Sequence, residues 1–229
     1  MKEVYQPGHL PVRNQLGYIA ASKLLFDPYL NRRGIKVRGL ENLPGGSAPY
    51  ILAANHRSLL DVPVLGQILL EHDGTQLHFV AKKELWKYKL LGKYLDSTDV
   101  IKYDRDLKMS NQPEVVDRMN SVLQNEGVLA MFPEHTRKHG RELQITKRGL
   151  GMLAVANLVP IVSVGLHGTD SLRGPIHVNI AKATPVGLVG PDSRRRRIVE
   201  MEYEYTAALQ DAINQAYEMA GATIAKPDL

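Results

Sequence analysis

A histidine and an aspartate stand close together where a predicted strand ends and a predicted helix begins. His56 and Asp61 are five positions apart. On one regular helix their side chains would point about 140° apart, so they can meet only if His56 precedes the helix. A carboxylate bonded to one imidazole nitrogen leaves the other nitrogen to accept a proton from a hydroxyl group. The pair therefore predicts general-base catalysis, which contributes roughly 10²–10⁴-fold in rate.

The same residues also have a structural interpretation. Ser58 and Asp61 have the spacing of a capping box, in which Ser58 would be the N-cap and Asp61 would lie in the first turn of the helix. That position would let the carboxylate point back toward His56. The same spacing is also compatible with a structural role, in which His56 is a loop histidine bonded only to the backbone. A second feature is needed to choose between catalysis and this structural role.

The second feature follows an apolar run at 128–131 that predicts another strand. The next residues, 132–138, place a carboxylate, a hydroxyl group and several cations on one loop. Arg137 can grip a phosphate or carboxylate at two points, and Glu134 can orient that arginine or bond a substrate hydroxyl. The alternative interpretation is a solvated surface loop with local ion pairs.

Two further cations end apolar stretches between these loops. Lys82 follows Val80 and Ala81, and Arg105 follows the run 100–103. The carboxyl ends of parallel strands meet at one edge of an α/β sheet, where ligands usually bind. Each cation alone is typical of a solvated surface, but their repeated placement favours a site for an anionic ligand.

Short β-rich runs alternate with stretches of helical spacing. This pattern predicts an α/β fold, a three-layer sandwich with a central, mainly parallel mixed sheet flanked by helices. The predicted strands are 50–54, 77–81, 100–103, 128–132, 161–166 and 177–181, and the predicted helices are 59–71, 113–125 and 147–157. We expect one domain over 1–229, with an N-terminal segment at 1–35, a catalytic core at 36–182 and a C-terminal helical region at 198–221.

Two terminal segments stand outside this alternation. Residues 16–28 predict a short apolar helix that is ended by Pro28 and followed by Arg32 and Arg33; it could lie on a membrane or equally pack across the sheet. The arginine run at 194–197 predicts a solvated loop. An amphipathic helix that should pack on the body is marked by Ala208, Leu209, Ala212, Ile213, Ala216 and Tyr217.

Taken together, four blocks in order resemble the glycerolipid acyltransferase family typified by 1-acylglycerol-3-phosphate (lysophosphatidate) acyltransferases. The resemblance covers about residues 36–182 and is specific because the order and spacing of all four blocks match. The blocks are Asn55-His56-x-x-x-x-Asp61; Lys82-x-Glu84-Leu85 through Gly92 to Asp104-Arg105; Phe132-Pro133-Glu134-x-Thr136-Arg137; and Val159-Pro160-Ile161-Val162.

The resemblance implies a one-step acyl transfer to a hydroxyl of the acceptor. His56 would act as the base and Asp61 would support the imidazole, so no serine acyl-enzyme is needed. The co-substrate would be acyl-CoA or acyl carrier protein carrying the acyl thioester, with no cofactor and no metal. The acceptor would be 1-acylglycerol 3-phosphate, a lysophospholipid that the reaction would convert to phosphatidate; glycerol 3-phosphate, another lysophospholipid or a glycolipid remains an alternative. The residues implied in binding its glycerol phosphate are Asn55, Lys82, Arg105, Glu134, Thr136 and Arg137.

Two positions depart from the pattern of the family. His135 stands between Glu134 and Thr136, where the family usually has glycine, and histidine tolerates positive φ less readily. We therefore expect the local backbone to differ there. Ser163 replaces a second proline of many members, which is a milder change. A catalytically dead lipid-binding relative is disfavoured because His56 and Asp61 are both present.

Composition bounds the compartment and the partners. The chain has no cysteine, which excludes disulfides, thiolate metal ligands and cysteine nucleophiles. No apolar run reaches the roughly 18–20 residues needed to cross a bilayer, and the N-terminus lacks the pattern of a secretory signal peptide. We expect a cytoplasmic protein that lies peripherally on the cytoplasmic face of a membrane, with residues 16–26, Arg32 and Arg33 at the membrane surface.

The formal charge of +5 and the pI of about 9.3 favour anionic partners. A non-enzymatic alternative is an anionic-ligand or nucleic-acid binding module that uses the arginine run and the basic strand ends. Only 6% of the residues are Phe, Trp or Tyr, which leaves few platforms for stacking bases, although binding to a duplex backbone would not need them. We therefore expect no nucleic-acid partner.

Overall fold

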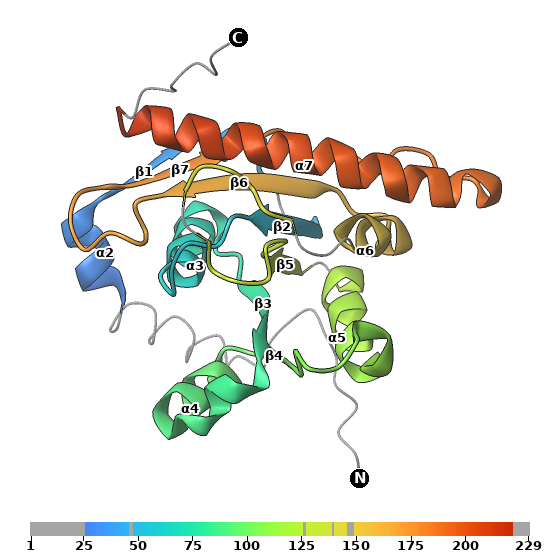
Figure 1. Cartoon of the computed structure of the whole chain (residues 1–229), viewed down its shortest axis with the longest axis horizontal. Helices are drawn as coiled ribbons and strands as arrows, with labels where there is room; N and C mark the ends of the chain where they lie inside the picture. Colours follow the sequence, from blue (N-terminus) through green and yellow to red (C-terminus); the bar gives the residue numbers. More distant parts are fainter. Residues whose placement is uncertain (1–25, 46–47, 126, 139, 146–148, 222–229) are drawn as a thin grey trace.

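Seven strands form one central sheet in the computed structural model, which describes residues 26–45, 48–125, 127–138, 140–145 and 149–221 (Figure 1). Their order across the sheet is β1-β7-β6-β2-β5-β3-β4. The strands are β1 (Ile35–Arg38), β2 (Tyr50–Ala54), β3 (Leu77–Lys82), β4 (Ile101–Tyr103), β5 (Val128–Met131), β6 (Ile161–His167) and β7 (Ile176–Ile180).

Strand direction defines the edge at which a site can form. Strands β6, β2, β5, β3 and β4 run parallel to one another, whereas β7 pairs antiparallel with β6, and β1 pairs parallel with β7. The predicted mainly parallel mixed sheet is therefore confirmed. The carboxyl ends of the five parallel strands meet at one edge, which we call the carboxyl edge; the opposite side is the amino edge.

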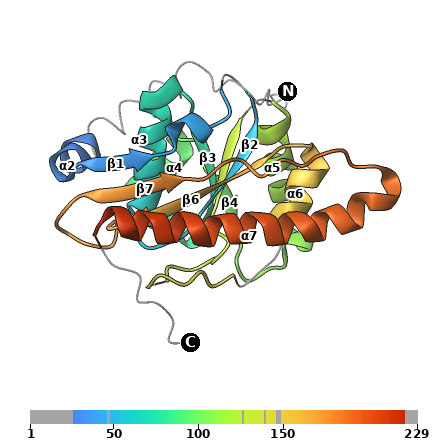
Figure 2. The same ribbon diagram turned by 90° about the horizontal axis from the view of Figure 1, so that it is seen from above.

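Helices cover both faces of this sheet (Figures 1 and 2). One buried cluster joins the sheet to α2, α3 and α4, and a second joins it to α5, α6 and α7, which gives the predicted three layers. The helices are α2 (Asp27–Arg33), α3 (Asp61–Asp73), α4 (Lys89–Ser97), α5 (Pro113–Gln124), α6 (Leu150–Asn157) and α7 (Arg194–Met219); short 3₁₀ helices lie at Leu40–Asn42, Lys83–Lys87, Met109–Asn111 and Pro191–Ser193. Within these described residues, no helix has the length and apolar character needed to cross a membrane.

The central position of β2 explains its composition. All five of its residues are buried, because a parallel strand between two helical layers meets apolar side chains on both faces. Leu52 and Ala54 pack toward α3, while Ile51 and Ala53 pack toward α6 and α7. This continuous apolar run is the reason the bounds of β2 could be predicted without error.

Two elements escaped prediction. Strand β1 has four residues in which half-buried Ile35 and Val37 alternate with exposed Lys36 and Arg38, so its apolar signal is weak. Helix α4 is rich in lysine and buries little more than Leu95 fully. Both elements lie at the periphery of the sheet, where few side chains are buried and the hydrophobic pattern in the sequence is therefore weak.

The N-terminal segment differs from its prediction. Residues 16–25 lie outside the described residues, and Pro28 stands in the first turn of α2 rather than ending a helix. Arg33, which we expected at a membrane surface, instead holds the loop between β6 and β7. Its guanidinium donates to the carbonyl oxygens of Ser171 (2.6 Å), Gly168 (2.8 Å) and Gly174 (2.9 Å).

Replacing Arg33 with alanine should lower the free energy of unfolding by about 2–4 kcal/mol, because a hydrogen bond to a charged group contributes about 1.5–3 kcal/mol net and two of these bonds are exposed to water. Urea denaturation measures this change. The matched control is Arg32→Ala, an exposed neighbour on the same helix, which should change stability by less than about 0.5 kcal/mol. Equal effects of the two substitutions would contradict the prediction.

The C-terminal helix packs on the body as predicted, but it begins earlier. Residues 194–197 open α7 instead of forming a solvated loop, and Arg197 bonds Glu204 and the carbonyl oxygens of Pro185 and Val186. The helix approaches β6 closely at Gly165, where a Cβ atom would overlap the carbonyl oxygen of Ala212. The predicted region at 198–221 therefore misses the first turn of a helix that ends at Met219.

Candidate active site

The imidazole of His56 is bonded to the carboxylate of Asp61. His56 Nδ1 lies 2.7 Å from Asp61 Oδ2, and the aspartate side chain is fully buried while the histidine side chain is 20% exposed. The carboxylate needs a donor, so Nδ1 carries the proton and Nε2 is left as an acceptor. The arrangement is that of a general base held in one tautomer, with access from solvent.

The loop after β2 brings these two groups together. Asp61 is the first residue of α3, and its Oδ2 also accepts the main-chain N–H groups of Arg57 (2.7 Å) and Ser58 (2.8 Å). A carboxylate at a helix N-terminus is stabilised by the helix dipole. One aspartate therefore closes the loop and orients the imidazole.

The capping-box interpretation is only half right. The N-cap residue of α3 is Leu60, not Ser58, and the Ser58 hydroxyl accepts the N–H of Leu60 instead (2.9 Å). The carboxylate does reach back to the Ser58 N–H, as in a capping box. The structural and the functional interpretation of Asp61 thus apply together.

A phenylalanine fixes the plane of the imidazole. The rings of Phe132 and His56 stack with their centroids 4.4 Å apart and their planes at 26°. Phe132 directly follows β5, which is hydrogen-bonded beside β2. Phe132 heads the block that contains Glu134, but the sequence pattern alone assigns it no role.

Glu134 joins the two loops from beneath rather than facing a ligand. Its side chain is fully buried; Oε2 accepts the main-chain N–H of His56 (2.7 Å), and the carboxylate pairs with the buried guanidinium of Arg57 (3.2 Å). Arg57 Nη1 also donates to the carbonyl oxygen of Lys138 (2.7 Å). The structure thus shows Glu134 positioning the backbone of His56, and its assignment to the substrate stays a prediction.

Asn55 is likewise bonded within the protein, and its assignment to the substrate stays a prediction. Its side chain is fully buried, and its amide exchanges two hydrogen bonds with the main chain of Leu166 in β6, at 2.9 and 2.7 Å. The amide therefore has its main partners within the protein. Asn55 therefore holds the end of β2 against β6 and fixes the point at which the loop with His56 begins.

The four other predicted binding residues lie along the carboxyl edge. Lys82 ends β3 and is partly buried, whereas Arg105, after β4, is exposed, as are Thr136 and Arg137 after β5. Strands are about 4.8 Å apart, so the end of β3 lies about 10 Å from the end of β2, and β4 is one strand farther. Arg137 and Lys82 are thus nearer the dyad than Arg105, and the structure leaves their function as binding residues a prediction.

His135 takes the backbone conformation that glycine favours. Its φ is 56°, in the left-handed region. The turn is tight, with the Thr136 N–H donating to the carbonyl oxygen of Glu134 at 2.7 Å. The expected difference in local backbone is therefore not confirmed, since a histidine here keeps positive φ.

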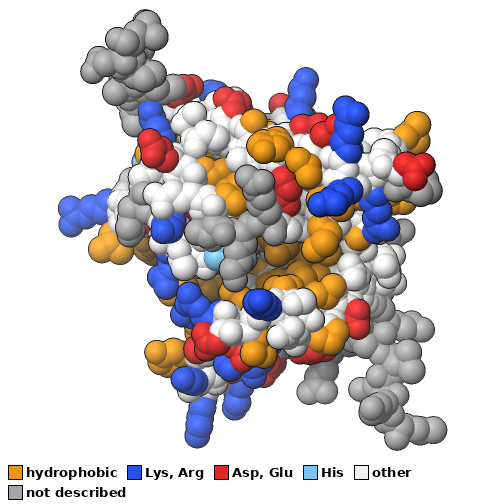
Figure 3. Space-filling view, turned by 45° about the vertical axis from the view of Figure 1, so that its right-hand side comes forward, with side chains coloured by type: hydrophobic (Ala, Val, Ile, Leu, Met, Phe, Trp, Pro, Cys, Tyr) orange, Lys and Arg blue, Asp and Glu red, His pale blue; other side chains and the backbone are white. Residues whose placement is uncertain are grey.

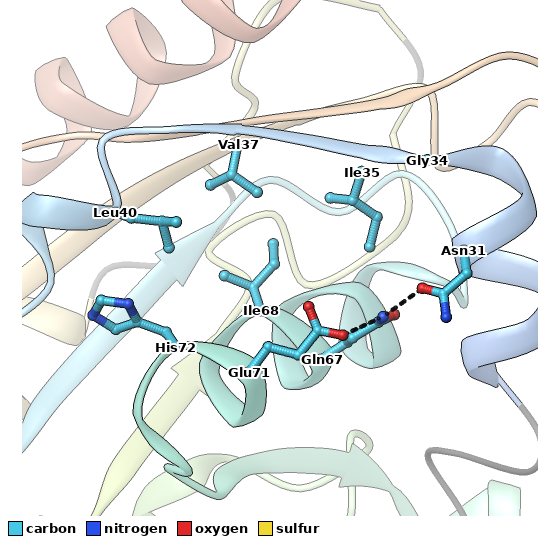
Figure 4. Close-up of a pocket in the computed structure, with 9 residues that line it drawn as sticks. All are labelled: Asn31, Gly34, Ile35, Val37, Leu40, Gln67, Ile68, Glu71 and His72. Atoms are coloured by element: carbon cyan, nitrogen blue, oxygen red, sulfur yellow. Dashed lines mark hydrogen bonds between the residues drawn. The ribbon is translucent and has the colours of Figure 1, made fainter.

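A groove of about 420 Å³ lies away from the dyad, between α2, β1 and α3 (Figure 4). Ile68 and His72 line it, about 10 and 16 Å along α3 from Asp61 at 1.5 Å per residue. At its floor the Gln67 amide donates to Asn31 (3.0 Å) and Glu71 (2.8 Å). This groove does not open on His56, so it does not hold the reacting groups.

One cluster of carboxylates lies at the far end of the carboxyl edge. Ligand atoms of Glu84, Asp104 and Asp106 are within 4.8 Å of one another. Asp104 is ion-paired with Lys83, and this partner lowers the pKa of the Asp104 carboxyl group. The ammonium group therefore neutralises part of the charge that a cation would need.

Comparison with known proteins identifies relatives of the chain. A family model described as "Acyltransferase" matches residues 34–167. The 1-acyl-sn-glycerol-3-phosphate acyltransferase of Saccharomyces cerevisiae is 35% identical over 147 residues, which cover 62% of this chain and 45% of that protein. The enzyme of the same name from Bacillus subtilis is 31% identical over 140 residues, covering 61% and 66%. The chain thus spans less than two thirds of the length of either relative.

A solved structure supports the fold. The 1-acyl-sn-glycerophosphate (LPA) acyltransferase PlsC from Thermotoga maritima aligns with a TM-score of 0.59 and 22% identity, covering 94% of this chain and 80% of that one. At this identity the likeness concerns the fold alone. It agrees with the three-layer architecture derived from the buried clusters.

Proposed function

The chain belongs to the acyltransferase family, and from this premise we propose that it moves an acyl group from a thioester to the free hydroxyl of 1-acylglycerol 3-phosphate, forming phosphatidate. The observation that carries the proposal is the Nδ1–Oδ2 bond of 2.7 Å between His56 and Asp61. That bond leaves Nε2 as the acceptor for the proton of the hydroxyl. The curated relatives named for this activity support the choice of acceptor.

The proposed reaction balances without a cofactor or metal. The acceptor hydroxyl gives its proton to His56 Nε2 while its oxygen forms a bond to the thioester carbonyl carbon. Asp61 stabilises the resulting imidazolium. The tetrahedral intermediate then expels the thiolate, which takes the proton back from Nε2, so His56 ends as it began. The leaving thiol is that of coenzyme A or acyl carrier protein.

In this proposal, the cations of the carboxyl edge bind the phosphate of the acceptor. Arg137 is exposed and, among the described residues, its guanidinium has no hydrogen-bond or ion-pair partner. A planar guanidinium can bind phosphate through two parallel hydrogen bonds. We assign Arg137 and Lys82 to the phosphate and Arg105, the most distant, to long-range attraction; Thr136 can donate its hydroxyl to the same group.

Replacing Arg137 with alanine should raise the KM for 1-acylglycerol 3-phosphate about 10–100-fold, because a charge-assisted bond contributes about 1.5–3 kcal/mol. The kcat should change little. Steady-state kinetics with varied acceptor concentration measures both values. Arg38→Ala is the matched control, since Arg38 is exposed but ends β1 at the amino edge. An unchanged KM in Arg137→Ala would remove this residue from the site.

A matrix of acceptors and donors tests the function as a whole. Purified protein is assayed with 1-acylglycerol 3-phosphate, glycerol 3-phosphate, other lysophospholipids and a glycolipid, each with acyl-CoA and acyl carrier protein donors. Formation of phosphatidate from 1-acylglycerol 3-phosphate is the expected result. Consumption of glycerol 3-phosphate without consumption of 1-acylglycerol 3-phosphate would show the assigned acceptor to be wrong.

The arginine run does not favour nucleic-acid binding as a second function. Arg196 and Arg197 are ion-paired with Glu200 and Glu204 on the same helix. Their charge is therefore largely neutralised locally. Only Arg194 and Arg195 of the run remain as exposed cations without such a pair among the described residues.

A further inference from the structure

A patch of lysines and exposed apolar side chains surrounds the start of α4. Tyr88 is 68% exposed and Leu90 85%, and they alternate with the exposed lysines Lys87 and Lys89, with Lys93 one turn further. We call these five residues the α4 patch. Among the described residues, its three lysines form no ion pair.

The exposure of this patch follows from how α4 packs. Leu95 is buried against the sheet, and half-buried Leu91 and Tyr94 pack around the same cluster. At about 100° per residue, Lys89 and Lys93 lie on the opposite side, and Leu90 flanks them. The helix thus packs one apolar face on the core, while Leu90 remains exposed among cations. Exposed apolar side chains beside lysines are typical of helices that lie on a membrane surface.

The patch lies beside the edge that carries the dyad. Strand β3 ends at Lys82 on the carboxyl edge, the 3₁₀ helix Lys83–Lys87 follows at once, and α4 begins two residues later. Figure 1 places α4 at the lower end of the molecule, away from α7. The same end in Figure 3 shows Lys and Arg side chains with hydrophobic and a few acidic ones among them.

We propose that the α4 patch docks on the surface of a bilayer that contains anionic lipid. Charge complementarity points to this partner: residues 83–93 hold four lysines and one glutamate, and only Lys83 of the four is neutralised, by Asp104. Tyrosine and leucine at such a surface enter the headgroup boundary while lysines contact lipid phosphates. Docking there would bring the carboxyl edge to the membrane that holds the lipid substrate and product. This inference rests on the proposed function.

This surface differs from the membrane contact expected from the sequence. Residues 16–25 lie outside the described residues, and Arg33 is bonded to the loop between β6 and β7. Its guanidinium is therefore not available to lipid headgroups. The α4 patch has its cations and apolar side chains exposed together.

Vesicle binding by the full chain tests the proposal without turnover. Sedimentation is measured with phosphatidylcholine vesicles and with vesicles that also contain phosphatidylglycerol, at low and high salt. The variants are Lys87→Ala/Lys89→Ala/Lys93→Ala and Tyr88→Ala/Leu90→Ala. The matched control is Arg194→Ala/Arg195→Ala/Leu188→Ala, which removes exposed cations and an exposed leucine at the amino edge.

We expect tight binding only to the anionic vesicles, weakening with salt. The triple lysine variant should bind about 100-fold more weakly, since each lysine near such a surface contributes about fivefold. The Tyr88/Leu90 variant should lose about tenfold or more, because each buried methylene contributes about fourfold. The control should stay within about twofold of the unaltered protein, and all variants should keep their thermal midpoint because the side chains are exposed.

Three results would overturn the proposal. The first is unchanged vesicle binding by both patch variants, and the second is an equal loss in the amino-edge control. The third is that the patch variants bind vesicles normally but lose activity only with the acyl carrier protein donor. That result would assign the patch to binding an acidic protein. Vesicle binding is measured without turnover, so failure of the proposed acyl transfer would not change the binding result. Activity on a soluble short-chain acceptor tests the proposed acyl transfer separately.

Discussion

Replacing His56 with alanine should lower kcat for acyl transfer by about 10²–10⁴-fold, because the variant has no group to take the proton of the acceptor hydroxyl. The imidazole is partly exposed, and Asp61 keeps its bonds to the N–H groups of Arg57 and Ser58 when the imidazole is removed. The KM for the acceptor and the thermal midpoint should therefore change little. Steady-state kinetics together with thermal unfolding separates loss of chemistry from loss of fold.

Asp61→Asn tests the other half of the dyad. The amide keeps the size of the carboxylate but cannot stabilise an imidazolium, so kcat should fall while acceptor binding is retained. Here stability should fall as well, since Oδ2 also accepts the N–H groups of Arg57 and Ser58. Substantial turnover by His56→Ala would discard the mechanism, whatever the result for Asp61→Asn.

Replacing Glu134 with glutamine should lower the free energy of unfolding by about 3–5 kcal/mol. The substitution leaves the Arg57 guanidinium buried without its counter-charge, and breaking a buried pair from one side has a cost of this size. Arg57 is 2% exposed, and its Nε and Nη2 atoms are already buried without a partner among the described residues. Urea denaturation measures the loss.

A double substitution supplies the control. Arg57→Met/Glu134→Gln removes both charges, so it should recover most of the stability that Glu134→Gln loses. In folded Glu134→Gln, kcat should fall while the KM for the acceptor is kept, because Glu134 holds the main-chain N–H of His56. A large rise in KM with normal kcat would instead mean that Glu134 binds the acceptor, as the sequence suggested.

The catalytic pair was within reach of the sequence because its geometry is local. Five positions separate His56 from Asp61, and a loop that leads into a helix has few ways to place them. The strands β2 and β5 were also accessible, since both lie in the centre of the sheet and carry unbroken apolar runs. Family resemblance then chose between the structural and the functional interpretation.

What the sequence could not supply are contacts between residues far apart in the chain. Asn55 and Glu134 carry polar groups suited to a ligand, and only the fold shows that Leu166, Arg57 and the backbone of His56 occupy them. The same holds for Arg33, whose partners lie more than a hundred positions away. A polar residue in a conserved-looking motif is thus ambiguous between binding a ligand and holding the loop that binds it.

Helix α7 has a consequence for how the protein is made. It follows all seven described strands in the chain, yet Met201 and Tyr205 on its inner face belong to the buried cluster that includes residues of β2 and β6. A ribosome delivers the strands, α5 and α6 first, so part of this apolar sheet face stays uncovered in the growing chain until α7 has been synthesised. Such a face attracts chaperones and neighbouring nascent chains, and this part of the core closes only after α7 has been synthesised.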